Sequence, residues 1–348
     1  MLTILHGDSD DLICFAWSET DRTGHVTKLD TLGRRNRQKA QSTGKRVSLQ
    51  DRDILWLQKL HEHGPLPSSF LLAYAKDTHR SEKRAKERLT DLFNEANTAH
   101  GGPYLSRPPQ QFRTLDSRYN QLVYDLTPAA EKALKQAGLW QERSAARAGP
   151  WLHGFMVSCT TASIELAVLD HDGLLYIPQS RLLERADTDL RYPVDTPDPD
   201  TGRVYQKDLI PDALFALEYD TPEGKRYRSF LVEADRSTEP ATSKNFNRKS
   251  WQRNLTQYEQ YVGQGLYKDH LNLKSSILIL NVVTDPKRTE QIIRTMETHA
   301  PSLAGRMLFQ AWEDFGPVFT PPKPKTALLE GGWSRVHFPD VYIDRAKN

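Results

Sequence analysis

Three carboxylates in the second half of the chain have a spacing that suits metal chemistry. Asp212 begins an apolar stretch, Ala213–Tyr219, and 21 residues after it a second apolar stretch reaches Glu233 and Asp235. Alternate residues of a strand point to the same face of a sheet, so Glu233 and Asp235 share a face. If the two stretches pair as a hairpin, Asp212 approaches that pair. Carboxylates that converge in this way raise one another's pKa unless a cation holds them.

Such a cluster predicts a site for Mg²⁺ or Mn²⁺, cations that prefer oxygen ligands and keep several waters. One of those waters can act as a nucleophile while the ion neutralises charge on a phosphate. The residue types therefore indicate metal-assisted cleavage of a phosphodiester, with Asp212, Glu233 and Asp235 as candidate ligands.

The order Pro211-Asp212, a spacer, then Glu233-x-Asp235 on an apolar strand resembles the core of the PD-(D/E)XK nucleases. Together with the N-terminal pattern described below, it is similar to the replication-relaxation family. The relaxases of C-type mobilisable plasmids, which share a nuclease-like core, are a neighbouring comparison. The resemblance implies a metal-dependent protein of a plasmid, phage or integrated element that cleaves or relaxes DNA strands. The matching stretches are 48–138, 151–170 and 209–284, with the most specific local match at 231–239.

The resemblance also implies roles for individual residues. Asp212 and Glu233 would hold the ion, and Asp235 would be a third ligand or position a water. Glu165 stands where the nuclease core carries an acid on a helix, so it is a further candidate ligand; an acid without a site role fits it equally well. His153 on the same helix could face the site, although a single histidine on an apolar helix is usually a hydrogen-bonded core residue.

The sequence departs from the nuclease pattern at one important position. A lysine is expected two residues after Glu233, where it orients water and stabilises the charged transition state, and Asp235 stands there instead. On the next helix, where variants carry the displaced lysine, this chain has Asn254. Lys249 is our candidate replacement, because the neighbouring Arg253 is a poor proton acceptor. A site without that lysine could cleave slowly or only bind DNA.

Tyr258 and Tyr261 are three residues apart on the predicted helix, so they share one face. Relaxases with covalent catalysis use a tyrosine nucleophile. A tyrosine pair can also pack on the sheet with its hydroxyls at the edge. We favour packing, because a metal-activated water explains the carboxylates without a tyrosine.

Residues 48–142 have the pattern of a winged helix-turn-helix. Three short helices, the third of them basic, precede two extended stretches, 103–107 and 122–126, and a closing helix that follows Thr127. In that fold the third helix enters the major groove and the two-stranded wing approaches the backbone, so the expected partner is double-stranded DNA. A merely solvated basic helix is the alternative. The candidate DNA contacts are Arg80, Lys83, Arg84, Lys86 and Arg88 around the third helix, and Arg107, Arg113 and Arg118 in the wing.

The region before this pattern contains a basic arm. No acid occurs between Asp30 and Asp51, and six lysines and arginines fall in that gap. It is either a solvated linker or an arm that tracks phosphates through residues such as Arg34, Arg35 and Arg37. Ahead of it, 11–17 and 25–29 suggest a short hairpin.

The 348 residues suffice for two domains, and we expect an α+β protein. The expected parts are an N-terminal hairpin and arm (1–47), a winged helix (48–142), an α/β nuclease-like domain with a mixed central sheet (151–320) and a tail (321–348). The Asp- and Pro-rich segment 188–202 is expected to be a loop.

Composition and motifs exclude several classes of protein. No apolar run approaches the roughly 20 residues of a membrane helix, so no membrane partner is expected. Two cysteines are too few for a disulfide framework, which favours the cytoplasm. Walker, G-x-S-x-G and H-E-x-x-H motifs are absent, which disfavours ATP hydrolysis, serine hydrolysis and zinc proteolysis. The sequence leaves a homodimer open.

Three functions remain. The leading hypothesis is a DNA-binding, metal-dependent endonuclease or relaxase-like protein. The second is a non-enzymatic replication or transcription regulator with a degenerate nuclease fold, which Asn254 and the missing lysine favour. The third is a protein-interaction module whose basic helix is only solvated.

Overall fold

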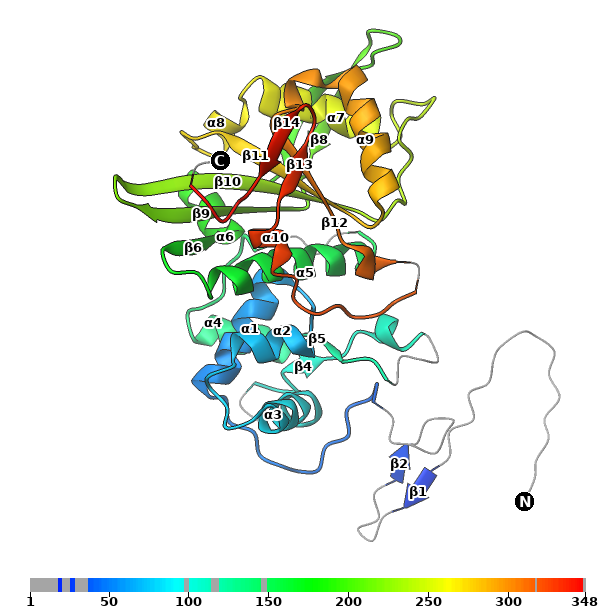
Figure 1. Ribbon diagram of the computed structural model, residues 1–348. Coiled ribbons are helices and arrows are strands. Elements are labelled where there is room, and N and C mark those ends of the chain that lie inside the picture. Colours follow the sequence, from blue (N-terminus) through cyan, green and yellow to red (C-terminus); the bar gives the residue numbers. More distant parts are fainter. Residues whose placement is uncertain are drawn as a thin grey trace, which may run out of the picture.

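The computed structural model describes residues 18–20, 26–28, 37–96, 100–113, 119–144, 149–316 and 318–346. It is a mixed α+β structure with one large mixed sheet, in agreement with the expected fold class. Figure 1 shows the sheet and its helices in the upper part and a smaller helical part below. Near the N-terminus, β1 (Ser18–Thr20) pairs with β2 (Val26–Lys28) as a hairpin. The predicted first strand, 11–17, lies outside the described residues.

The helical part combines four helices with a three-stranded antiparallel sheet in which β5 lies between β3 and β4. Local caps set the helix starts: the Ser81 hydroxyl accepts from the Arg84 amide, and the Thr127 hydroxyl accepts from the Ala130 amide. The first helix begins after Gln50, which is its N-cap residue. The elements are α1 (Asp51–His63), β3 (Leu66–Pro67), α2 (Ser68–Tyr74), α3 (Glu82–Asn94), β4 (Leu105–Ser106), the short η1 (Pro109–Phe112), β5 (Val123–Leu126) and α4 (Pro128–Gln136).

Helix α5 (Trp151–Val168) connects the two parts of the molecule. It is apolar on every side, and such a helix is stable only when it is covered on every side. All of its residues from Phe155 to Val168 are buried. One side contacts α1 and α2, and the other contacts β6, β9 and β10. A single hydrophobic cluster therefore runs from the helical part through α5 to one face of the large sheet.

The large sheet has the order β14-β13-β12-β11-β10-β9-β6. Strands β10, β11 and β12 are parallel to one another, and β9 pairs antiparallel with β10 as the predicted hairpin, with Ala213 opposite Val232. Side chains alternate, so Val232 packs with α5 while Leu231 packs on the opposite face. The strands are β6 (Leu174–Pro178), β9 (Ala213–Thr221), β10 (Gly224–Asp235), β11 (Ile277–Val283), β12 (Met307–Ala311), β13 (Trp333–Arg335) and β14 (Phe338–Val341).

The opposite face is covered by a second hydrophobic cluster. Its helices contribute Leu182, Leu255, Tyr258 and Ile292. Helix α9 starts after Asp285, whose side chain accepts a hydrogen bond from the Lys287 amide. The elements are α6 (Gln179–Ala186), α7 (Trp251–Tyr258), the π-helical turn η3 (Glu259–Gly263), α8 (Tyr267–His270), α9 (Pro286–His299) and the short η4 (Pro301–Leu303).

The expected loop 188–202 is wrong in its middle, where the chain forms a strand. Strand β7 (Tyr192–Pro197) pairs antiparallel with β8 (Val204–Leu209) in a separate two-stranded sheet. Only Val194 and Thr196 of β7 are fully buried. With prolines and aspartates around them, the sequence shows no clear alternation of apolar and polar residues. Prolines are tolerated in strands at sheet edges, and both strands of a two-stranded sheet are edges.

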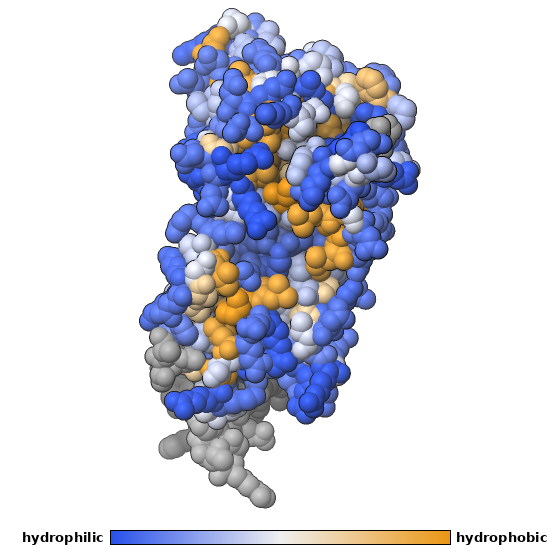
Figure 2. All heavy atoms as spheres, turned by 90° about the vertical axis from the view of Figure 1, so that its left-hand side faces the viewer, coloured by the Kyte–Doolittle hydropathy of each residue, from blue (hydrophilic) through white to orange (hydrophobic). Residues whose placement is uncertain are grey.

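The C-terminal segment completes the sheet. After η5 (Glu313–Phe315) the chain returns along α5, where the Lys325 amide donates to the Ser163 hydroxyl (3.1 Å). Helix α10 (Ala327–Glu330) and strands β13 and β14 follow. Trp333 is fully buried, whereas Phe338 stays half exposed. Figure 2 shows a mostly hydrophilic face with apolar side chains gathered at mid-height, where the two parts meet. No helix of the described residues is long and apolar enough to cross a membrane.

Candidate functional site

Asp212 is held rigidly at the end of the β9–β10 hairpin. Its amide donates to the Val232 carbonyl (3.1 Å), which extends the strand pairing by one residue. Its Oδ2 accepts from the Ala234 amide (2.8 Å), and its Oδ1 lies 2.8 Å from Nε2 of His153. Both carboxylate oxygens therefore have partners that fix the orientation of the side chain.

His153 comes to this site from the first turn of α5. Its hydrogen bond to Asp212 raises the pKa of the imidazole, and burial opposes that rise. The charged imidazole is thus favoured beside the carboxylate. The sequence favours an ordinary core role for a single histidine on an apolar helix, and the structure places His153 against Asp212.

Glu233 is the buried member of the acid pair. It accepts a short hydrogen bond from the Tyr258 hydroxyl of α7. Burial raises the pKa of Glu233 well above its usual range, and the nearby charge of Asp212 raises it further. The Tyr258 hydrogen bond and the charge of Lys249 act in the opposite direction. A buried carboxylate beside a second carboxylate is the situation that a bound cation relieves.

Lys249 lies on the loop before α7 and interacts electrostatically with both acids. Burial lowers the pKa of its ammonium, but Glu239, Glu233 and Asp212 more than offset that effect, and the net shift is upward. Its Nζ lies 2.6 Å from a Glu239 carboxylate oxygen. The candidate replacement for the missing lysine is therefore close enough to interact electrostatically with Asp212 and Glu233.

Asp235 shares a face with Glu233 as predicted, but its carboxylate has other partners. It accepts from Trp251 Nε1 (2.8 Å), Arg288 Nε (2.5 Å) and the Ser237 amide (2.7 Å). The Arg288 guanidinium neutralises its charge. The structure therefore does not leave Asp235 free beside Glu233.

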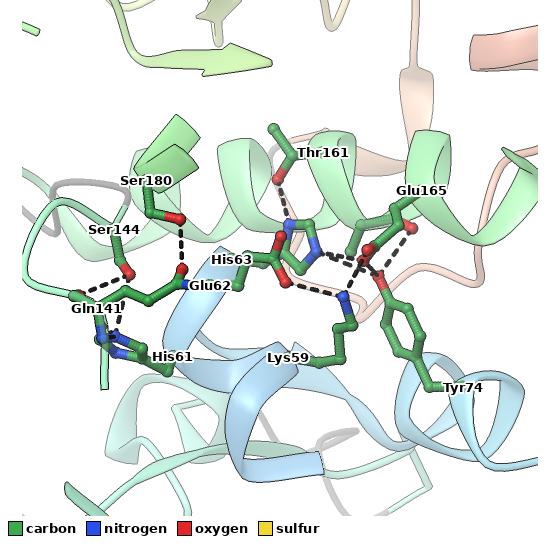
Figure 3. Close-up of polar contacts among 11 residues, drawn as sticks. Lys59, His61, Glu62, His63, Tyr74, Gln141, Ser144, Thr161, Glu165 and Ser180 are labelled. Carbon is green, nitrogen blue, oxygen red and sulfur yellow. Dashed lines mark hydrogen bonds and ion pairs between the residues drawn. The ribbon is translucent and has the colours of Figure 1, made fainter. Parts of the chain in front are cut away.

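Glu165 is not brought together with Asp212 and Glu233. It lies 12 residues after His153 on α5, which is about 18 Å along a helix axis. Figure 3 shows it in a buried network with Lys59 and His63 of α1 and Tyr74 of α2, at 2.5, 2.8 and 2.7 Å. Burial raises the pKa of Glu165, but His63 and Lys59 outweigh burial and lower the pKa to about 2.

This network also contains a group with metal-ligand spacing. Among the described residues, Glu62, His63 and Glu165 form the group of three whose ligand atoms lie within 4.8 Å of one another. The Lys59 ammonium donates to both Glu62 (2.8 Å) and Glu165 and already supplies the positive charge. The predicted acids do not form a group of three at this spacing.

The tyrosines differ in their contacts. The Tyr258 hydroxyl bonds Glu233, whereas the Tyr261 hydroxyl lies 2.7 Å from Nδ1 of His270. Burial, and then the charge of Glu233, raise the pKa of Tyr258 well above its usual range. A phenol that resists deprotonation is a poor nucleophile.

Several of the predicted DNA contacts lie on the exposed side of α3. Arg80, Lys83, Arg84 and Lys86 are exposed, with Arg84 and Lys86 paired to acids of the same helix. A hollow of about 790 Å³ beside them is lined largely by cations. Its lining residues are Lys45, Arg52, His79, Arg80, Arg84, Glu87, Arg88 and Asp91.

Two of the predicted contacts have partners within the fold. Arg88 forms a two-pronged ion pair with Asp53, a fully buried acid at the start of α1. Arg107 stacks its guanidinium 3.8 Å over the Phe93 ring and donates to the Arg37 carbonyl (2.8 Å). Arg37 itself donates to the Asn120 carbonyl (3.2 Å), and Arg113 is exposed. Arg34, Arg35 and Arg118 lie outside the described residues.

The geometry so far defines a protein with a small basic helical part and a sheet that carries a carboxylate pair. A family model for replication-relaxation matches residues 57–277, from α1 to the start of β11. Because this match covers more than half of the chain, the protein belongs to the replication-relaxation family. No curated protein and no solved structure matches the chain.

Proposed function

We propose that this protein binds double-stranded DNA through its helical part and nicks one strand at Asp212 and Glu233 with Mg²⁺ or Mn²⁺. The observation that carries the proposal is the convergence of two acids from adjacent strands, one of them buried and with a raised pKa. Membership of the replication-relaxation family fits a role in the replication or mobilisation of a mobile element.

The donor set fits a magnesium-type ion. Mg²⁺ is usually held by one or two carboxylates and keeps the rest of its waters, so Asp212 and Glu233 suffice without Asp235. A bound ion would supply a water-derived nucleophile and neutralise charge on the scissile phosphate. His153 and the Ala234 amide hold the Asp212 carboxylate in place, and Tyr258 holds Glu233. The Lys249 ammonium adds positive charge for a phosphate that approaches the pair.

The order of the helical part supports DNA binding. Three helices precede two strands and a closing helix, which is the order expected from the sequence, and the short β3 is added between the first two helices. In this arrangement α3 would enter the major groove with Lys83, Arg84 and Lys86, and Arg80 would lie at its start. Arg88 and Arg107 would support the helix and the wing rather than contact DNA.

The test is conversion of supercoiled plasmid to open circle in Mn²⁺. Wild type should nick the plasmid, and Asp212→Asn and Glu233→Gln should not, while both still bind DNA. Asp195→Asn, an exposed acid on β7, is the matched control and should nick like wild type. Nicking by both acid variants at the wild-type rate would refute the assignment of the acids.

One observation favours the regulator as the second candidate. Asp235, at the lysine position, is tied to Arg288, and Lys249 is shared with Glu239. A regulator with this degenerate site would shift DNA in a gel, would not nick it with either ion, and would gain no thermal stability from Mn²⁺.

A further inference from the structure

The loop between β10 and α7, residues 236–250, carries an excess of positive charge beside the acid pair. It contains Arg236, Lys244, Arg248 and Lys249 but only one acid, Glu239, which pairs with Lys249. Arg236, Lys244 and Arg248 form no ion pair with a carboxylate of the described residues. Three cations of the loop are therefore available to an anion.

Arg236 is the most informative of these cations. Its side chain is partly buried, and its Nε is hidden from solvent without a hydrogen-bond partner. Burial alone lowers the pKa of its guanidinium, because no neighbouring acid compensates. A cation that is partly removed from water without a counter-charge gains when an anion arrives.

The loop is fixed in place before anything binds. Asp235 accepts from the Ser237 amide and from Arg288, and Arg288 also donates to the Glu239 carbonyl. The side chain of Phe246 is buried, which anchors the far end of the loop. The amides of the first two residues of α7 donate to the carbonyls of Pro240 and Ala241, at 3.1 and 2.8 Å. A preorganised surface loses less conformational entropy on binding than a flexible one.

The position of the loop links it to the acids. It leaves β10 three residues after Glu233 and ends at α7, whose Tyr258 contacts Glu233. Figure 1 shows this connection beside α7 and α9, on the face of the sheet opposite α5. Its remaining exposed side chains include Thr238, Asn245 and Asn247, neutral groups of the kind that donate to phosphate oxygens.

We infer that loop 236–250 is a second DNA-binding surface, which holds the sugar-phosphate backbone of the strand next to Asp212 and Glu233. This inference rests on the proposed function for its ligand, but it concerns binding and not cleavage. Asp235 and Arg288 then serve as positioning residues that hold the loop. The contacts expected of these lysines and arginines are with phosphates, which position the DNA without reading its sequence.

The test is the salt dependence of binding to a fluorescent duplex oligonucleotide. The variant Lys244→Gln/Arg248→Gln removes two phosphate contacts and should lower the slope of log affinity against log salt by about two on duplex DNA. The matched control is Lys268→Gln/Lys274→Gln, which changes two exposed lysines near the start of β11. Loop 236–250 lies near the opposite end of that strand. The control should keep the wild-type slope.

The same titration with a single-stranded oligonucleotide of the same sequence tests whether the loop also binds a separated strand. If it does, the loop variant should lower the salt slope by about 1.4 on that oligonucleotide. An unchanged slope on both oligonucleotides, or an equal loss in the control, would overturn the inference. Circular dichroism checks that each variant is folded, and Arg236→Gln provides an independent one-contact variant.

The same assay separates this inference from the proposed function. Asp212→Asn should lose nicking and keep the full salt slope. If wild type fails to nick any DNA, the proposed cleavage fails, and the slope of the loop variant still decides whether the loop binds the backbone.

Discussion

Single residues at the acid pair are held by contacts that exist before any ligand arrives. Asp212 uses both oxygens, one toward His153 and one toward the Ala234 amide, and Glu233 accepts from Tyr258. Supported side chains of this kind keep a site in its productive geometry. Burial and the charge of Asp212 disfavour the ionised form of Glu233, and a bound cation would relieve both effects, which is the residue-scale reason to expect a cation here.

Tyr258 provides a test at this scale. Its raised pKa keeps the hydroxyl protonated, so it should serve Glu233 as a hydrogen-bond donor and not attack DNA. Tyr258→Phe should keep nicking within about tenfold, the equivalent of one lost hydrogen bond. Tyr261→Phe, which removes a hydroxyl bonded to His270, is the control. A protein–DNA adduct seen with wild type in a denaturing gel, and absent with Tyr258→Phe, would contradict this role.

The elements of the helical part depend on one buried ion pair. Asp53 at the start of α1 also accepts from the Gln50 amide (2.9 Å), and Arg88 of α3 neutralises it. The charges of α3 are thus of two kinds. Arg88 ties α3 to α1, whereas Lys83 is exposed and has no ion-pair partner among the described residues.

Substitution of Arg88 and of Lys83 should distinguish the charge that stabilises the fold from the charge that is free to bind DNA. Arg88→Gln leaves a buried carboxylate unpaired and should lower the free energy of unfolding by about 3 kcal/mol. Lys83→Gln should leave stability within about 0.5 kcal/mol and lower the salt slope of DNA binding by about one. Urea unfolding and fluorescence anisotropy measure the two effects. A stable Arg88→Gln protein with weakened DNA binding would reverse the assignment.

The elements also show what local sequence can and cannot predict. Helix starts at Ser81 and Thr127 were predictable because a cap bonds within its own turn. The β7–β8 pair was not, because its few buried residues gain their burial from packing with distant segments. The role of Asp235 was also hidden, since its partner Arg288 lies 53 residues away and nothing local marks the pair.

The whole molecule is organised around α5, and packing on its two sides determines which residues contact His153 and Glu165. A helix that is apolar on every side has no polar face. Its sequence therefore does not indicate which neighbour each of its few ionisable residues contacts. Packing on both sides directs His153 to the acid pair and Glu165 to the helical part. That Asp212 approaches Glu233 was predictable, because strand alternation and hairpin pairing are short-range rules.

The network of Glu165, Lys59, His63 and Tyr74 joins the two parts and should make their stability depend on pH. Glu165 has a folded pKa of about 2 and an ordinary value of 4.5. Its contribution is therefore complete above about pH 4.5 and is lost as the pH falls toward 2. Removing the charge should cost about 3 kcal/mol at pH 7.

Urea unfolding at pH 7 and at pH 3 tests this linkage. Glu165→Gln should be less stable than wild type at pH 7, and the difference should shrink at pH 3. Glu184→Gln, an exposed acid on α6, is the control and should match wild type at both values. An equal difference at both pH values would show that the loss comes from packing and not from charge.

The most direct test of the central claim is calorimetric titration of the protein with Mn²⁺. Wild type should bind the ion, Asp212→Asn and Glu233→Gln should lose that binding, and Glu165→Gln should retain it. This pattern would place the ion at the acid pair. Binding that survives both acid substitutions, or that disappears in Glu165→Gln instead, would contradict the account and move the ion to the network between α1 and α5.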